Sequence, residues 1–334
     1  SEGVLVANDD LFLARYGADG SLQWVVTPVD SSRSDGLTSV AVDAADNAHV
    51  VGRFNGTLVL AAGTTLTFAS AVEQAGFIAK YDGAGSLAWA YATDERSYLY
   101  SVATDAAGNT FVTGVYKGTI DFGFGPGSGT LANASGQTDL FVARYDANGS
   151  LAWVTGTGAS SGTEDAYDIA VDGSGNVFIT GRVDGSVDFD PSTAGVATVE
   201  GLNGASMFVA KYDSAGQFQW VTTPQTNQVE DVGLAVATDG AGAAYVTGYF
   251  RSTVDFDPGA GTARLVATGS SDHFVAKYDA GGTLVWVTGP GAPSGDESGF
   301  GVAAGPSGNV FATGFFFGTA DFDPRPDVTL TEVS

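Results

Sequence analysis

A short alternation of hydrophobic side chains recurs five times along the chain. In "FVAKY" (Phe208–Tyr212), Phe, Ala and Tyr alternate with Val and Lys, and related pentapeptides begin at Phe12, Phe77, Phe141 and Phe274. A period of two residues is typical of a β-strand, because successive side chains point to opposite faces of a sheet. A glycine-containing turn and a strand bearing a tryptophan follow each pentapeptide, so each copy predicts a β-hairpin.

A second predicted hairpin alternates with the first. Its copies, such as "IAVDGSGNVFITG", begin at Val40, Val102, Ile169, Val236 and Val302. The first strand of each copy has few polar residues, as expected for a strand that is buried on both faces. Aspartate before the turn should accept hydrogen bonds from the turn's own backbone amides. No segment has the periodicity of a helix, so two hairpins make one four-stranded sheet per repeat.

The spacing of the repeat predicts the architecture. The tryptophans Trp24, Trp89, Trp153, Trp220 and Trp286 are separated by 65, 64, 67 and 66 residues. Four strands in a repeat of this length are typical of a propeller blade. The sequence therefore predicts an all-β fold, a five-bladed β-propeller, as one domain over residues 1–334. The tryptophans recur at one position of the repeat and are predicted to be core residues. A Lys or Arg also recurs at one position, and we expect it to pair with a neighbouring carboxylate.

The ends of the chain fall inside repeat units. The hairpin at 12–26 has no inner hairpin before it, and the hairpin at 302–315 has no outer hairpin after it. We expect these two hairpins to pair, which would close the ring without a free edge. The alternative is an excised piece of a longer array. The chain begins with Ser1 and shows no signal-peptide pattern, so we expect a mature or excised product.

Two segments carry a resemblance to a known family. "DLFVARYDANGSLAWVTG" (139–156) and "DIAVDGSGNVFITG" (168–181) resemble the bacterial SBBP β-propeller repeats, over nearly the whole chain. The resemblance implies a propeller in a secreted or cell-surface protein of bacterial type, often beside adhesive or sorting modules. It implies no reaction and supplies no catalytic residues. The chain differs from the usual seven blades by having five units, and it has a longer insertion between the two hairpins.

Charge and composition exclude several partners. The chain has 38 acidic and 13 basic residues, a net charge of -25, and no cysteine. Such a surface repels phosphate backbones and anionic lipid, so neither nucleic acid nor a membrane is an expected partner. The sequence also has no apolar run long enough to span a membrane, which likewise argues against membrane insertion. The absence of cysteine excludes disulfides, thiolate catalysis and cysteine-bound zinc. Metal cations and basic proteins remain possible ligands.

The repeated motif D-F-D-P is a candidate calcium site. Its two carboxylates share one strand face, but calcium takes six to eight oxygen ligands, and proline stands where a third ligand should come. The first two repeats also lack the full motif. The pattern favours the strand end and turn of an inserted hairpin, with calcium binding as the alternative. The tentative metal ligands are Asp188, Asp190, Asp255, Asp257, Asp321 and Asp323.

A second acidic set precedes the inner strands, at Asp35, Glu95, Glu164, Asp231 and Glu297. Inner strands line the axis of a propeller, so these residues are candidates for a ring of carboxylates on a ligand-binding face. They could cap loops and keep the protein soluble, or they could attract a cation or a basic ligand.

The sequence contains no recognisable catalytic motif. It has no G-x-S-x-G, H-E-x-x-H or phosphate-binding loop, and its candidate acids follow the repeat. We therefore expect a non-enzymatic binding or scaffold module that takes a protein or glycan ligand and needs no cofactor, with calcium possible. The alternatives are a carbohydrate-active enzyme with carboxylates in the channel and a passive structural spacer.

Overall fold

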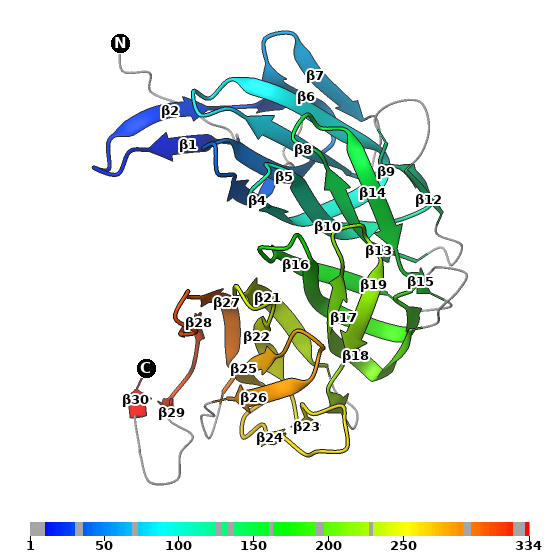
Figure 1. Ribbon diagram of the computed structural model, residues 1–334, viewed down its shortest axis with the longest axis vertical. Coiled ribbons are helices and arrows are strands. Elements are labelled where there is room, and N and C mark those ends of the chain that lie inside the picture. The colour runs from blue at the N-terminus through cyan, green and yellow to red at the C-terminus, as the bar shows by residue number, and fades with distance from the viewer. Residues whose placement is uncertain are drawn as a thin grey trace.

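The computed structural model describes residues 11–30, 36–68, 73–123, 129–132, 137–159, 163–190, 197–226, 230–289, 295–322 and 331–333. Every regular element within these ranges is a β-strand. Figure 1 shows the strands as a succession of sheets along an arc, with the two termini at its two ends. The all-β class and the repeat organisation predicted from the sequence are confirmed.

Four groups of four strands have the predicted pattern of two antiparallel hairpins, and we call them blades I to IV. Blades I and II belong to one seven-stranded sheet, because one long strand runs through both. Blade I contains β4 (Gly36–Val42), β5 (Ala48–Phe54), β8 (Ala75–Tyr81) and the first part of β9 (Leu87–Thr104). Blade II contains the rest of β9, β10 (Thr110–Tyr116), β13 (Asp139–Tyr145) and β14 (Leu151–Gly156). Blade III contains β16 (Glu164–Val171), β17 (Val177–Asp188), β18 (Thr198–Tyr212) and β19 (Phe218–Thr222). Blade IV contains β21 (Val232–Thr238), β22 (Ala244–Phe250), β25 (Asp272–Tyr278) and β26 (Leu284–Thr288).

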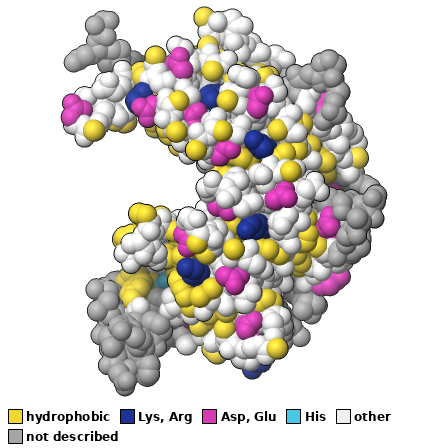
Figure 2. All heavy atoms as spheres, in the orientation of Figure 1, with side chains coloured by type: hydrophobic (Ala, Val, Ile, Leu, Met, Phe, Trp, Pro, Cys, Tyr) yellow, Lys and Arg dark blue, Asp and Glu magenta, His cyan; other side chains and the backbone are white. Residues whose placement is uncertain are grey.

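The two terminal hairpins stand apart from each other. The N-terminal hairpin is β1 (Leu13–Tyr16) with β2 (Leu22–Val26), and the C-terminal hairpin is β27 (Ser298–Ala304) with β28 (Val310–Phe315). Each forms a separate two-stranded sheet, and no pairing joins them among the residues described. The arc is therefore open, and Figure 2 shows the hollow between its two ends. Each terminal hairpin matches one half of a blade.

Short strands between the hairpins form the predicted insertions. The VDFDP segment at 254–258 begins in β23 (Thr253–Asp255), which pairs with β24 (Arg264–Val266) and with β20 (Gln225–Thr226), a strand just before blade IV. The corresponding small sheets are β3 (Val29–Asp30) with β6 (Gly56–Ala61) and β7 (Thr64–Phe68), β11 (Thr119–Asp121) with β12 (Thr130–Ala132), β15 (Gly158–Ala159) with the ends of β17 and β18, and β29 (Thr319–Asp321) with β30 (Thr331–Val333).

The repeated tryptophans join successive blades. The indole Nε1 of Trp153 in blade II donates a hydrogen bond of 3.1 Å to the carbonyl of Ser214, in the outer turn of blade III. The ring lies over Gly216 of the same turn, where an added Cβ would approach it to 2.7 Å. The same indole-to-carbonyl hydrogen bonds are Trp24 to Gly83, Trp89 to Ala147 and Trp220 to Ala280.

The repeated cations reach the same carbonyls. Arg144 donates to Ser214 at 2.9 Å and Lys211 donates to Ala280 at 3.2 Å. Arg15 and Lys80 bind the equivalent carbonyls of Gly83 and Ala147. The expected pairing with a carboxylate occurs only for some of them, such as Lys80 with Asp43 at 3.2 Å. Trp24, Trp153 and Trp220 are half-buried at the seams between blades, and Trp286 in blade IV is exposed. Only Trp89, with 9% exposure, comes close to the predicted core burial.

Two substitutions of Trp153 should separate the contribution of its ring from that of its hydrogen bond. Trp153→Ala removes a half-buried ring and its hydrogen bond, so the free energy of unfolding should fall by about 2–3 kcal/mol. Trp153→Phe keeps most of the apolar contact and should cost about 1 kcal/mol, the usual net value of one hydrogen bond. Urea denaturation of both variants measures the two effects. Equal losses in both would mean that the indole ring contributes nothing beyond its hydrogen bond.

Candidate functional site

The DFDP motifs take part in turns and core packing. Phe189 and Phe256 are fully buried, and their rings lie 4.9 Å from those of Phe208 and Phe274. Oδ1 of Asp188 accepts hydrogen bonds from the amides of Asp190 and Ala197, at 3.0 and 2.9 Å. Asp255 accepts equivalent bonds from Asp257 at 3.3 Å and Ala263 at 2.8 Å. The predicted role as strand end and turn is confirmed for these two motifs.

The metal role of these aspartates stays a prediction. Within the described ranges no group of three or more metal-ligating side chains comes together. Asp321 ends β29, and Asp323 lies outside the described residues.

The second acidic set lies mostly inside the wall of the arc. Glu164, Asp231 and Glu297 are at most 1% exposed, whereas Glu95 is exposed. Asp35 lies outside the described residues. Three of the predicted ligand-face residues are thus enclosed between blades, and the ligand role predicted for the set stays untested. The sequence carried a signal for this difference, because Glu95 lies two residues before the position that the other acids share. Ser97 holds that position in the second repeat, and it is buried like them.

Glu164 caps a strand of the preceding blade. Its Oε2 accepts hydrogen bonds from the amide of Leu140 at 3.3 Å and from the hydroxyl of Thr157. Burial, helped by the nearby charge of Asp139 and opposed by the hydrogen bond from Thr157, raises the pKa of Glu164 to about 7. Burial also raises the pKa of Asp139 to about 6. Removing two carboxylates from water disfavours their charged forms, so both groups hold their protons to a higher pH than exposed carboxyl groups do.

A buried polar network at the seam between blades I and II has the connectivity of a catalytic triad. Nδ1 of His49 lies 2.7 Å from Thr110 Oγ1, and Nε2 lies 3.1 Å from Asp43 Oδ2, which Lys80 also contacts. His49 and Thr110 have no exposed surface, so no substrate can reach the hydroxyl. Burial lowers the pKa of His49 and favours the neutral ring. This network joins the blades rather than forming a reactive centre.

Accessible functional groups gather instead at the starts of the inner strands. Tyr100 and Tyr167, on neighbouring blades, have ring centroids 5.7 Å apart, and both hydroxyls donate to Asp165, at 3.4 and 3.1 Å. Arg182 donates to Asp165 and to Glu230, at 2.9 Å each. We call the full set the arginine–tyrosine cluster: Arg53, Arg96, Tyr98, Tyr100, Asp165, Tyr167, Arg182, Glu230, Tyr249 and Arg251.

The arginine–tyrosine cluster is continuous from blade I to blade IV. The guanidinium groups of Arg53 and Arg96 both lie near the ring of Tyr98, at 5.8 and 5.5 Å from its centroid. At the other end, Arg251 lies 5.7 Å from the ring of Tyr249 and 3.6 Å from Glu230. Four of the chain's 13 basic residues are in this cluster. It therefore gathers arginines on a strongly acidic protein, and most of their charges are paired with Asp165, Glu230 and the neighbouring Glu73, which lies 3.9 Å from Arg96.

Ionisation within the cluster favours fixed hydrogen-bond donors. Burial raises the pKa of Tyr100 to about 12, and the charge of Asp165 adds to the shift. The pKa of Tyr167 is raised by the same two causes. For Arg182, burial lowers the pKa, but the hydrogen bond to Asp165 together with the charges of Asp165, Tyr167 and Glu230 outweighs it, and the pKa rises. Both hydroxyls and the guanidinium therefore keep their protons at any physiological pH.

A single carboxylate stands on an inner strand beside the cluster. Asp168 accepts hydrogen bonds from Ser101 of blade II at 2.7 Å and from the amide of Val236 of blade IV at 2.8 Å. Burial raises its pKa. The equivalent positions in the other repeats are Ser39, Ser101, Ala235 and Gly301, so this acid breaks the repeat. The acids singled out in the sequence all recur with the repeat, so Asp168 was not among them.

Comparison with known proteins gives distant similarity. No family model matches the chain. It is 24% identical over 367 residues to an uncharacterized WD repeat-containing protein, L264, of Acanthamoeba polyphaga mimivirus, with 92% of this chain and 26% of that protein covered. The chain thus spans about a quarter of the length of this curated relative.

Among solved structures, a protein of unknown function from Bacteroides caccae is 10% identical with a TM-score of 0.37, covering 81% of this chain and 72% of the other. The D477G ACO/RPE65 chimera is 8% identical with a TM-score of 0.38, covering 92% and 63%. Among the described residues, no helix is long and apolar enough to cross a membrane.

The turn geometry of Asp255 gives a prediction about calcium. Asp255→Ala removes the acceptor for two backbone amides and should cost about 1–2 kcal/mol of stability. Asp255→Asn keeps an oxygen acceptor and should cost less. Addition of about 1 mM calcium, a level at which extracellular sites fill, should leave the melting temperature of all three proteins unchanged. A rise in the wild type that Asp255→Asn abolishes would make DFDP a metal site.

Buried Glu164 gives a prediction about pH. Its pKa in the folded protein is raised from 4.5 to about 7, so the folded state holds the proton more tightly than the unfolded state. The free energy of unfolding should therefore fall as pH rises from about 4.5 through about 7, by on the order of 2–3 kcal/mol. Glu164→Gln removes the titration and should be more stable than the wild type at pH 8 but not at pH 5.

Urea denaturation at the two pH values measures this difference, with Glu95→Gln as an exposed control. His49 and His273 have lowered pKa values because they are buried, and they act in the opposite direction, so the wild-type-minus-variant difference is the informative quantity. An equal difference at pH 5 and pH 8 would contradict the assignment.

Proposed function

We propose that this chain is a non-enzymatic binding or scaffold module of a secreted or cell-surface protein, folded as a closed five-bladed β-propeller of the SBBP-repeat type. Its ligand surface would be the arginine–tyrosine cluster. The repeat spacing and the blades of the structure support the propeller. The relative named as a WD repeat-containing protein supports a repeat architecture for this chain as well.

The observation that carries the proposal is the asymmetry of the cluster. The second inner strand of each repeat contains a glycine that recurs in all five repeats. The residue after this glycine is Arg53, Val115, Arg182, Tyr249 and Phe315 in turn. Packing of one blade on the next does not require this variation, since the neighbouring positions repeat faithfully. Variable polar and aromatic residues on a uniform scaffold are typical of a binding surface.

The chemistry of the cluster favours a glycan ligand. Half-buried tyrosine rings offer flat surfaces on which a sugar ring can stack, and paired arginine and carboxylate groups can bind hydroxyls from both sides. The local excess of arginine would also accept a carboxylate on the sugar. A carbohydrate-active enzyme would need two reachable carboxyl groups with different pKa values. The Glu164–Asp139 pair has raised pKa values but is enclosed between blades.

A glycan array that contains neutral and uronic-acid oligosaccharides tests the proposal. We expect binding by the wild type and a loss of at least about tenfold in affinity, or 1.4 kcal/mol, in Arg182→Gln and in Tyr167→Ala. Arg264→Gln, on the exposed insertion strand β24, is the matched charge control and should bind as the wild type does. Binding that survives both cluster variants would move the site elsewhere. Cleavage of any bound glycan would contradict the non-enzymatic assignment.

A further inference from the structure

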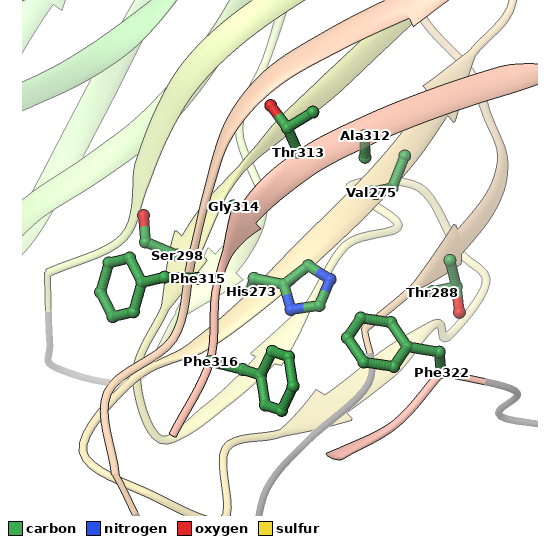
Figure 3. Close-up of a pocket in the computed structure, with 10 residues that line it drawn as sticks. All are labelled: His273, Val275, Thr288, Ser298, Ala312, Thr313, Gly314, Phe315, Phe316 and Phe322. Atoms are coloured by element: carbon green, nitrogen blue, oxygen red, sulfur yellow. The ribbon is translucent and has the colours of Figure 1, made fainter. Parts of the chain in front are cut away.

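The cavity shown in Figure 3 lies between blade IV and the C-terminal hairpin and has a volume of about 470 Å³. His273, Phe316 and Phe322 lie around it, and Thr313 and Gly314 of β28 form part of its wall. Its surface is mostly apolar, which would suit a small hydrophobic ligand. The repeat indicates a different occupant.

In blades II, III and IV the equivalent space is filled from the outer hairpin. Phe141, Phe208 and Phe274 occupy it, each at most 1% exposed, and each packs on the phenylalanine of the insertion. In the fifth repeat the insertion residue is Phe322, which is 39% exposed. The residue that corresponds to Phe141 is Phe12, at the start of the N-terminal hairpin, and it is 65% exposed.

We infer that the N-terminal hairpin is the occupant of this cavity, so that β1 pairs with β28 and Phe12 fills the space beside Phe316 and Phe322. The inference deepens the closed ring of the proposed function and rests on it. The register follows from the complete blades, in which Gly114 lies opposite Phe141, Gly181 opposite Phe208 and Gly248 opposite Phe274. It sets Gly314 opposite Phe12 and Ala312 opposite Ala14.

A side-chain hydrogen bond repeats in the same register. Thr113, Thr180 and Thr247 each donate to the carbonyl of the buried phenylalanine on the adjacent strand, at 2.8, 2.7 and 2.6 Å. Thr313 holds this position in β28 and would donate to the carbonyl of Phe12.

The seam contacts supply a second, independent match. Gly85, Gly149, Gly216 and Gly282 each lie against the tryptophan of the preceding blade, but the equivalent Gly20 has no atom within 4 Å of where a Cβ would stand. Trp286, which is 37% exposed, is the tryptophan that would cover Gly20. The carbonyl of Ala18 would then accept hydrogen bonds from Trp286 and Lys277. The N-terminal hairpin therefore carries the turn glycine and carbonyl of a seam contact, and blade IV carries the tryptophan and lysine that would complete it.

The chain's own hairpin is favoured over that of a second copy. The two ends lie on either side of one opening in the arc (Figure 1). Each half-blade occurs once in the chain, and a tethered partner has an effective concentration on the order of millimolar. A second copy would have to compete with this local concentration.

Paired cysteines test the register, because the native chain contains none. In Ala14→Cys with Ala312→Cys, mild oxidation at micromolar protein should give an intramolecular disulfide, since directly opposed residues are within bridging distance. Ala14→Cys with Val310→Cys has both side chains on the same face but two residues out of register, and should remain reduced. Mass spectrometry of the unreduced protein distinguishes the products.

A disulfide-linked dimer would show that a second copy fills the cavity and would overturn the inference, as would the absence of any disulfide. Hydrogen exchange of the unsubstituted protein provides a reading that does not depend on the folding of the variants. Closure should slow amide exchange in both β1 and β28 at least a hundredfold relative to an unstructured peptide, and fast exchange in β1 would overturn it. These readings need no ligand, so a failure of glycan binding leaves them unchanged.

Discussion

The structure depends on one backbone carbonyl in the outer turn of each blade. The indole of the preceding blade and, beside it, a lysine or arginine both donate to this oxygen, while the ring covers the turn glycine. The turn must be tight and must have a residue with positive φ, such as Gly216 at 79°, for the ring to approach. This contact explains why a cation, a tryptophan and a glycine recur together, since removing any one of them leaves the others without their partner.

The high acidity of the chain has a structural component. Aspartates such as Asp105, Asp146 and Asp172 accept two backbone amides each across the turn they begin. Amides directed at a carboxylate stabilise its charge without a cation, so many of the 38 acidic residues need no metal or basic partner. The repeat multiplies this turn, and a large negative charge follows. The arginines of the arginine–tyrosine cluster, of which Arg96, Arg182 and Arg251 pair with carboxylates by side-chain contacts, differ from that background.

Periodicity and repeat length were sufficient to predict strands, hairpins and insertions, because a two-residue period and an Asp-Gly turn are local properties. They were not sufficient for contacts between blades. Arg182 meets Glu230 across 48 residues only because the curvature of the arc brings β17 beside the start of blade IV. The sequence likewise could not show that Trp153 lies at a seam instead of inside a core, or that Glu164 is enclosed between blades instead of lining a ligand face. These outcomes depend on the distance between sheets, which no single repeat encodes.

The same face of the molecule carries two chemically different sectors. From blade I to blade IV it is lined by arginine, tyrosine and carboxylate groups, and beyond Tyr249 and Arg251 it continues to Phe300 and Phe315, whose rings are 5.5 Å apart. A second cavity, of about 400 Å³, lies where these sectors meet. If the ring is closed, Phe315 also becomes a neighbour of blade I, and the apolar sector has an arginine-containing sector on each side. The repeat thus builds a uniform frame, and the few positions that depart from it determine the chemistry of the face.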